Sequence, residues 1–136
     1  MVFEGTKVIA LEQAVAAPLC TRRLAQKGAE VIKIERETGD FARHYDSAVK
    51  GQSAYFVWLN GGKKSVVLNL EDEQHKATLA SLVESADILV QNLKPGALSK
   101  LGFDLNDWHS NNPRLISCSI SGFAPGGPGF SRKAYD

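Results

Sequence analysis

The sequence lacks an excess of charge of either sign and has no long apolar run. Its 16 Lys and Arg residues nearly balance its 15 Asp and Glu residues, and the formal net charge is +1. Such a chain generates no general field that would attract nucleic acid or an anionic membrane, so an anion must be bound by local groups. No apolar run approaches membrane-spanning length, and the first residues, MVFEGTKV, contain no signal-peptide segment. We therefore expect a cytoplasmic protein that binds neither nucleic acid nor a membrane.

Cysteine is scarce, and its positions form no metal-binding or redox motif. Cys20 and Cys118 each lie in an apolar stretch, outside any C-x-x-C pair or Cys/His spacing. We predict that both are reduced thiols in the core rather than a disulfide. The histidines, His44, His75 and His109, share no metal-ligand spacing either. We therefore expect no metal site.

Strand-like and helix-like segments alternate along the chain. The 136 residues, 43% of them hydrophobic, are enough for one domain with a core and too few for two ordinary ones. Because right-handed crossovers join parallel strands, the alternation predicts a Rossmann-like open, mainly parallel sheet with helices on both faces. The expected strands are KVIALE (7–12), EVIKIE (30–35), SVVLNL (65–70), DILVQN (87–92) and RLISCSI (114–120).

The expected helices lie between these strands. The first should have Pro18 as its first residue and end before Gly28. The segment EDEQHKATLASLVESA (71–86) is amphipathic, and NDWHSNNP (106–113) predicts a small helix. The segment AYFVWLN (54–60) is aromatic and buried in character, and both tryptophans are interpreted as core or helix anchors.

The turn after the first strand contains no glycine, which argues against a dinucleotide site. Its sequence is EQAVAAPLC, whereas NAD or FAD needs the G-x-G-x-x-G fingerprint so that the pyrophosphate can touch the backbone. The small residues Ala14, Ala16 and Ala17 still permit close approach by a bulky group. Open parallel sheets bind ligands beyond the carboxyl ends of their strands. We therefore expect the site in segments 12–18, 35–46, 68–72, 91–96 and 119–136.

Four blocks of sequence together resemble a known enzyme family. They are APLCTRRLAQKGAEVIKIER with GDFAR, YFVWLNGGKKSVVLNL, ADILVQNLKPGALSKLGFD, and PRLISCSISGFAPGGP with AYD. In this order and at matching spacing they are similar to the N-terminal part of the class III CoA-transferases, the CaiB/BaiF family. That family includes formyl-CoA transferase, carnitine CoA-transferase and alpha-methylacyl-CoA racemase.

The resemblance implies a Rossmann-like domain that binds coenzyme A, in a longer subunit that interlocks with a second copy to form a homodimer. It also implies an acyl-CoA and a carboxylic acid acceptor as substrates. The chemistry of the two cations is consistent with phosphate binding. The guanidinium of Arg36 offers several donors in one plane, and the ammonium of Lys100 is a point charge on a flexible side chain. Arg36 and Lys100 could instead be solvated surface charges that bind no ligand. Asn92 could instead cap the loop. The family's CoA contacts fall here on Ala14, Val15, Ala16, Arg36, Leu68, Asn92, Leu93, Lys100 and Lys133.

The family's reaction uses an aspartate nucleophile that attacks the acyl-CoA thioester. In relatives it lies in a G-D-x-x-x-G motif beyond the positions of Tyr135 and Asp136, so we expect no catalytic residue within this sequence. Racemases of the family carry His at the position of Tyr135, and Tyr, with a pKa of about 10, is a poor base at neutral pH. The resemblance therefore favours transfer over racemisation.

Two functions from different classes remain open. The first is the CoA-binding part of an acyl-CoA:carboxylate CoA-transferase that works through an aspartyl-CoA intermediate, completed by further sequence or by a complementing C-terminal chain. The second is a catalytically inactive remnant or an interaction module. An alpha-methylacyl-CoA racemase is the alternative within the family. In each case residues 1–136 are expected to be a truncated CoA-binding domain that lacks the second domain and the C-terminal return of the family.

Overall fold

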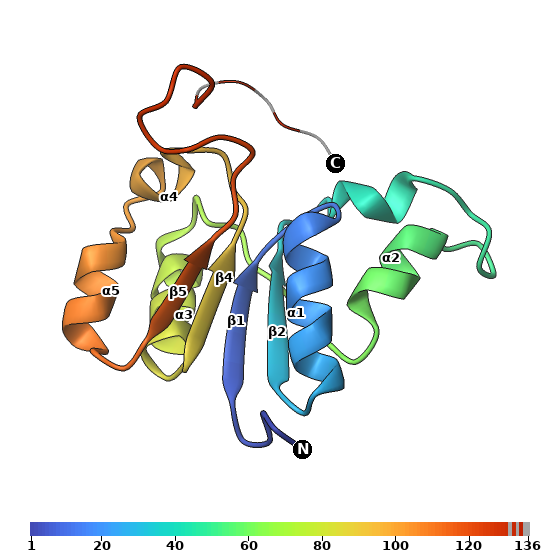
Figure 1. Cartoon of the computed structure of the whole chain (residues 1–136), viewed down its shortest axis with the longest axis horizontal. Helices are drawn as coiled ribbons and strands as arrows, with labels where there is room; N and C mark the ends of the chain where they lie inside the picture. Colours follow the sequence, from blue (N-terminus) through green and yellow to red (C-terminus); the bar gives the residue numbers. More distant parts are fainter. Residues whose placement is uncertain (131, 133, 135–136) are drawn as a thin grey trace.

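Five parallel strands form a single sheet in the order β3-β2-β1-β4-β5 (Figure 1). The structure is a computed structural model that describes residues 1–130, 132 and 134. The sheet confirms the predicted Rossmann-like architecture, because the strand order reverses direction between β1 and β4. The strands are β1 (Lys7–Leu11), β2 (Glu30–Glu35), β3 (Lys64–Val67), β4 (Ile88–Gln91) and β5 (Ile116–Ser119).

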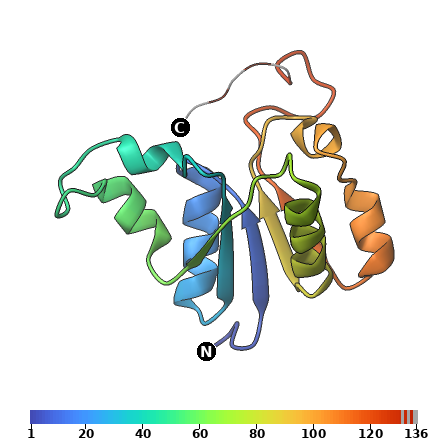
Figure 2. The ribbon, with the colours of Figure 1, turned by 180° about the vertical axis from the view of Figure 1, so that it is seen from behind.

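Helices cover both faces of the sheet, as the sequence predicts. Helices α1 and α2 lie on one face, and α3 and α5 lie on the other, as opposite views show (Figures 1 and 2). No helix among the described residues is long and apolar enough to cross a membrane. The helices are α1 (Ala16–Gln26), the short 3-10 helix η1 (Phe41–His44), α2 (Ala54–Asn60), α3 (Glu73–Glu84), α4 (Ala97–Lys100) and α5 (Leu105–Asn111).

The central strand β1 is apolar from Val8 to Leu11 because both of its faces are buried there. Ile9 packs in a cluster with Leu79 of α3, whereas Ala10 packs in a second cluster with Ala17 of α1. Successive side chains of a strand point to opposite faces, so a strand covered on both sides has no polar face. The predicted apolar face of α3 is confirmed, since Val83 is also fully buried.

Short polar side chains begin α3 and α5, but α1 begins differently. Asp72 and Asp104 each accept hydrogen bonds from backbone N–H groups in the first turn of the helix that follows. Helix α1 starts at Ala16, and its N-cap residue, Val15, makes no side-chain capping bond. The prediction that Pro18 is the first helical residue was wrong by two positions. Proline is tolerated there because the N–H groups of a first turn have no intrahelical partner.

The aromatic segment 54–60 forms helix α2 and is largely exposed, which corrects the prediction of a buried run. Only Leu59 is fully buried, while Tyr55 and Trp58 are 50% and 48% exposed. Their rings lie edge to face with centroids 6.1 Å apart, so each shields the other instead of entering the core. The interpretation of Trp108 as an anchor is confirmed, because it is 5% exposed in the cluster below α5.

Both cysteines are free, as predicted, but neither lies fully in the core. Cys20 and Cys118 are half-buried. The expected burial was wrong because each residue lies at the margin of a packed element: Cys20 on α1, and Cys118 on β5, the last strand of the sheet.

Candidate functional site

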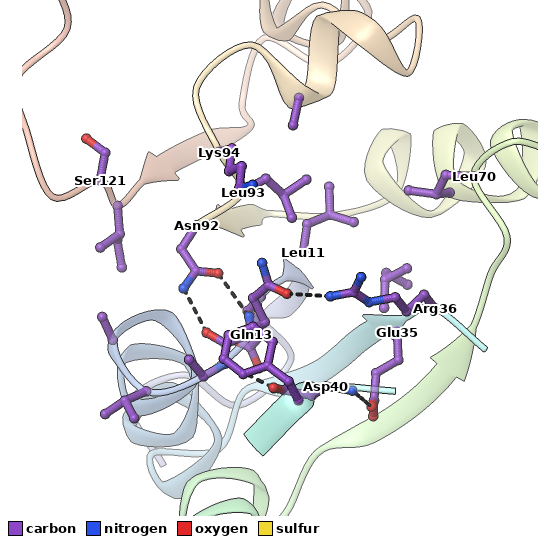
Figure 3. Close-up of a pocket in the computed structure, with 18 of the residues that line it drawn as sticks. Leu11, Gln13, Glu35, Arg36, Asp40, Leu70, Asn92, Leu93, Lys94 and Ser121 are labelled. Carbon is purple, nitrogen blue, oxygen red and sulfur yellow. Dashed lines mark hydrogen bonds between the residues drawn. The ribbon is translucent and has the colours of Figure 1, made fainter. Parts of the chain in front are cut away.

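A cleft of about 1440 Å³ opens at the carboxyl edge of the sheet. Every strand delivers the start of its following loop to this cleft, which therefore lies where open parallel sheets bind ligands. Figure 3 shows side chains from several of these loops converging on it. The main lining segments are 11–16, 34–41, 68–71, 92–95 and 120–123.

Most of the residues expected to contact CoA line this cleft. Lys100 is not among the described residues that line it, because it lies exposed at the end of α4; Lys94 lines the cleft instead. Lys133, the remaining candidate, falls outside the described residues, as does Tyr135. The candidates brought together are Ala14, Val15, Ala16, Arg36, Leu68, Asn92 and Leu93.

The turn between β1 and α1 is fixed by hydrogen bonds to side chains from other loops. The Asn92 side chain accepts from the Gln13 N–H at 2.9 Å and donates to the Gln13 carbonyl oxygen at 2.8 Å (Figure 3). The next residue, Ala14, has φ +63°, and its N–H donates to Asp40 Oδ1 at 3.0 Å. Left-handed backbone is unfavourable for a residue with a Cβ, so this conformation needs support. Asn92 therefore has a structural role, whatever ligand contact it makes.

A buried ionic cluster lies below this turn. Lys33 Nζ is 2.9 Å from Asp40 Oδ2 and 3.5 Å from Glu12 Oε1, and all three side chains are almost completely buried. Lys63 Nζ contacts the same Glu12 oxygen at 2.6 Å, and Thr21 Oγ1 donates to the other oxygen at 2.6 Å. Burial lowers the pKa of Lys63, and the neighbouring Glu12 carboxylate opposes that shift. The cluster is paired internally, so its charges are not available to a ligand.

Glu35, at the end of β2, is also fully engaged. Arg43 donates two hydrogen bonds to its carboxylate, at 2.8 Å from Nε and 2.7 Å from Nη2, and Ser65 Oγ donates a third at 2.7 Å. The N–H of Asp40 adds a fourth bond, at 2.9 Å. Burial raises the pKa of Glu35, but the hydrogen bonds from Arg43 and Ser65 outweigh burial and lower the pKa to about 2. Glu35 is therefore an ionised structural carboxylate and a poor candidate for proton transfer at neutral pH.

Two features of the cleft could hold an anion. Helix α1 begins at Ala16, which lines the cleft, and its N-cap residue makes no side-chain capping bond among the described residues. The positive dipole end of the helix therefore lies beside the cleft. Arg36 reaches over the same turn from the end of β2, and its Nη2 donates to Gln13 Oε1 at 3.0 Å (Figure 3). A guanidinium and a free helix start are both suited to a phosphate group.

Sequence reasoning missed Lys33 and Asp40, the two residues that most directly organise the turn. In EVIKIE, Lys33 reads as the exposed half of an alternating strand, yet it is 1% exposed. The available signal was that a strand covered by helices on both faces has no solvent-facing side, so an internal lysine needs a buried partner. The following loop supplies that partner in Asp40.

Comparisons with known proteins agree with this architecture. Residues 3–136 match the family model described as CoA-transferase family III. The chain is 43% identical over 135 residues to acetyl-CoA:oxalate CoA-transferase from Acetobacter aceti, and the match covers 98% of this chain and 35% of that protein. It is 41% identical over 136 residues to formyl-CoA:oxalate CoA-transferase from Escherichia coli O6:H1, and this match covers 98% of this chain and 33% of that protein.

Solved structures show the same likeness. A hypothetical protein (Rv3272) from Mycobacterium tuberculosis superposes with a TM-score of 0.91 at 36% identity, over 98% of this chain and 37% of that one. A CAIB/BAIF family protein from Brucella suis superposes with a TM-score of 0.89 at 36% identity, over 98% of this chain and 36% of that one. The chain spans about a third of the length of these relatives. The chain belongs to CoA-transferase family III.

Proposed function

We propose that residues 1–136 form the CoA-binding part of an acyl-CoA:carboxylate CoA-transferase that acts in the cytoplasm. The observation that carries this proposal is the start of α1, which has no side-chain cap in the part of the chain that the structure describes and opens into a large cleft at the carboxyl edge of the sheet. The two relatives named above are named for CoA transfer to oxalate. Family membership therefore supports CoA as the ligand, and the cleft supplies groups that suit it.

The parts of CoA differ in chemistry, and the cleft offers a counterpart for each. The phosphates need cations or free N–H groups, which Arg36, Lys94 and the start of α1 provide. Ala14 and Ala16 have small side chains that allow the ligand to approach the backbone closely. The apolar walls formed by Leu68 and its neighbours would receive the pantetheine arm or the base. Lys100 and Lys133 remain proposed contacts.

The acyl transfer itself would need a group outside this sequence. We propose an aspartate nucleophile in further sequence, which attacks the thioester carbon, releases the CoA thiolate and forms a mixed anhydride. The thiolate then attacks the aspartyl carbonyl of this anhydride, which expels the donor carboxylate and gives an aspartyl-CoA thioester. The acceptor carboxylate attacks that thioester to form a second anhydride and release the thiolate, and the thiolate attacks the acceptor acyl carbon, which yields the new acyl-CoA and frees the aspartate. Tyr135 favours this transfer over racemisation, because a tyrosine is a poor base at neutral pH.

A protein-interaction role is the second candidate, favoured by a row of exposed aromatic side chains. The ring centroids of Phe41, Tyr45, Tyr55 and Trp58 are separated in turn by 6.0, 5.9 and 6.1 Å, and all four side chains are at least 40% exposed. The partner we propose is a polypeptide corresponding to the remaining length of the relatives, either in a complementing chain or in an interlocked dimer.

Isothermal titration with CoA, dephospho-CoA and pantetheine tests the CoA proposal. We expect CoA to bind, Arg36→Ala to weaken its binding about tenfold, and pantetheine to bind much more weakly than CoA. The matched control is Arg114→Ala, which removes an equal charge from an exposed residue before β5, at the opposite edge of the sheet. No binding of CoA, or equal losses in both variants, would reject the proposed site. A chain that binds no CoA but forms a complex with the complementing polypeptide would select the interaction role.

A further inference from the structure

Three consecutive residues of the turn between β1 and α1 form backbone hydrogen bonds with three side chains from other loops or strands. Lys33 Nζ donates to the Glu12 carbonyl oxygen at 3.3 Å. Asn92 pairs with both backbone groups of the next residue, and Asp40 Oδ1 accepts from the N–H of the residue after that. The turn therefore has little freedom, although it contains no glycine.

Asp40 stands at the centre of this arrangement because its two carboxylate oxygens have different partners. Oδ2 is 2.9 Å from Lys33 Nζ, whereas Oδ1 accepts from Ala14 N–H at 3.0 Å and from Ala42 N–H at 2.9 Å. The side chains of Asp40 and Lys33 are 0% and 1% exposed. The ion pair thus fixes the rotation of the carboxylate and directs one oxygen at the turn.

The backbone of Asp40 is fixed in turn by Glu35 and Arg43. Its backbone N–H donates to Glu35 Oε2 at 2.9 Å, and Arg43 holds that carboxylate by two hydrogen bonds. Arg43 in turn lies 3.8 Å over the ring of Phe56. The support therefore extends from α2 through β2 to the turn.

The supported residue, Ala14, has a left-handed backbone that an alanine adopts only at a steric cost. This conformation sends the chain from β1 into α1 so that the helix starts beside the cleft, with no side-chain cap among the described residues. If Ala14 relaxed to φ below zero, the start of α1 would shift relative to Arg36 and Asn92.

We propose that Asp40, oriented by Lys33, is a positioning residue: it holds Ala14 in the left-handed conformation that places the start of α1 against the ligand. Asp40 does not touch the ligand in this scheme. The inference rests on the proposed CoA site, but its structural part can be tested without CoA. It differs from a simple stabilising role because it predicts rescue by a change at Ala14.

The first test uses the ligand-free protein. In wild type, the Ala14 amide should exchange slowly with solvent, and its nitrogen-15 NMR signal should shift when Asp40→Asn removes the carboxylate charge. Asp46→Ala is the matched control, because Asp46 Oδ1 also accepts two backbone N–H bonds, from Ala48 and Ala54, but away from the turn. A freely exchanging Ala14 amide in wild type, or equal shifts in both variants, would overturn the inference.

The second test measures CoA affinity by titration. Asp40→Ala should weaken binding about tenfold, and adding Ala14→Gly should restore most of the loss, because glycine adopts positive φ without the steric cost. Asp46→Ala should bind as wild type does. Equal affinity of Asp40→Ala and wild type, or the same loss with and without Ala14→Gly, would refute the positioning role. If Asp40→Ala does not fold, Asp40→Asn with and without Ala14→Gly decides by the same criteria. A wild type that binds no CoA rejects the proposed function, and the NMR test still decides the role of Asp40.

Discussion

Replacement of Lys33 by methionine should remove a large part of the free energy of unfolding. Lys33 is 1% exposed, and its ammonium lies 2.9 Å from Asp40 Oδ2 and 3.3 Å from the Glu12 carbonyl oxygen. Methionine fills similar space but removes the ammonium that contacts the buried Asp40 carboxylate. Removing one partner of a buried ion pair costs about 3–5 kcal/mol. Since domains of this kind are stable by about 5–15 kcal/mol, the loss is a major fraction of the free energy of unfolding.

Urea denaturation followed by tryptophan fluorescence measures this loss. The double variant Lys33→Met with Asp40→Asn should recover much of the stability, because it removes the unpaired charge together with its partner. Lys64→Met is the control: Lys64 pairs with Glu30 on the same sheet, but both side chains are substantially exposed, and its loss should be much smaller. A loss below about 1 kcal/mol in Lys33→Met, or a double variant no more stable than the single one, would contradict a stabilising ion pair between Lys33 and Asp40.

The remaining predictions concern the other residues that shape the cleft. The pKa of Glu35 is lowered from 4.5 to about 2, so its contribution to folding is complete above pH 4.5 and is lost as the pH falls toward 2. Urea unfolding across this range should show a decline of at most about 3 kcal/mol that Glu35→Gln removes. Ala14→Gly alone should raise the free energy of unfolding by up to about 1 kcal/mol in thermal denaturation, and a loss would contradict the assigned backbone. Asn92→Ala should cost about 2 kcal/mol, because both backbone groups of Gln13 lose a partner, and a neutral result would contradict that pairing.

The fold was accessible from the sequence because its signals are local. Strand β2 occupies the predicted residues 30–35, and α5 ends before Pro113 as its sequence indicates. The burial of segment 54–60 was misjudged because aromatic composition alone does not show whether a side chain enters the core. The Ser53 cap and the contact with α1 fix the helix so that Tyr55 and Trp58 stay half exposed.

The site was accessible only in part. The location of the cleft followed from the rule for parallel sheets, and the family resemblance supplied seven of the residues that line it. The support for the turn was not visible, because it depends on pairs far apart in sequence: Asn92 is 79 residues from Gln13, and Asp40 is 26 residues from Ala14. No local pattern signals that a lysine inside a strand and an aspartate in a loop act as one unit.

A crystal structure of the chain with bound CoA would show directly whether this cleft holds the ligand. We predict that CoA lies at the carboxyl edge of the sheet, with a phosphate group at the start of α1 and within reach of Arg36. We also predict that Ala14 keeps its left-handed backbone and its bond to Asp40. CoA bound at another face, or phosphates directed away from α1, would contradict the proposed CoA site.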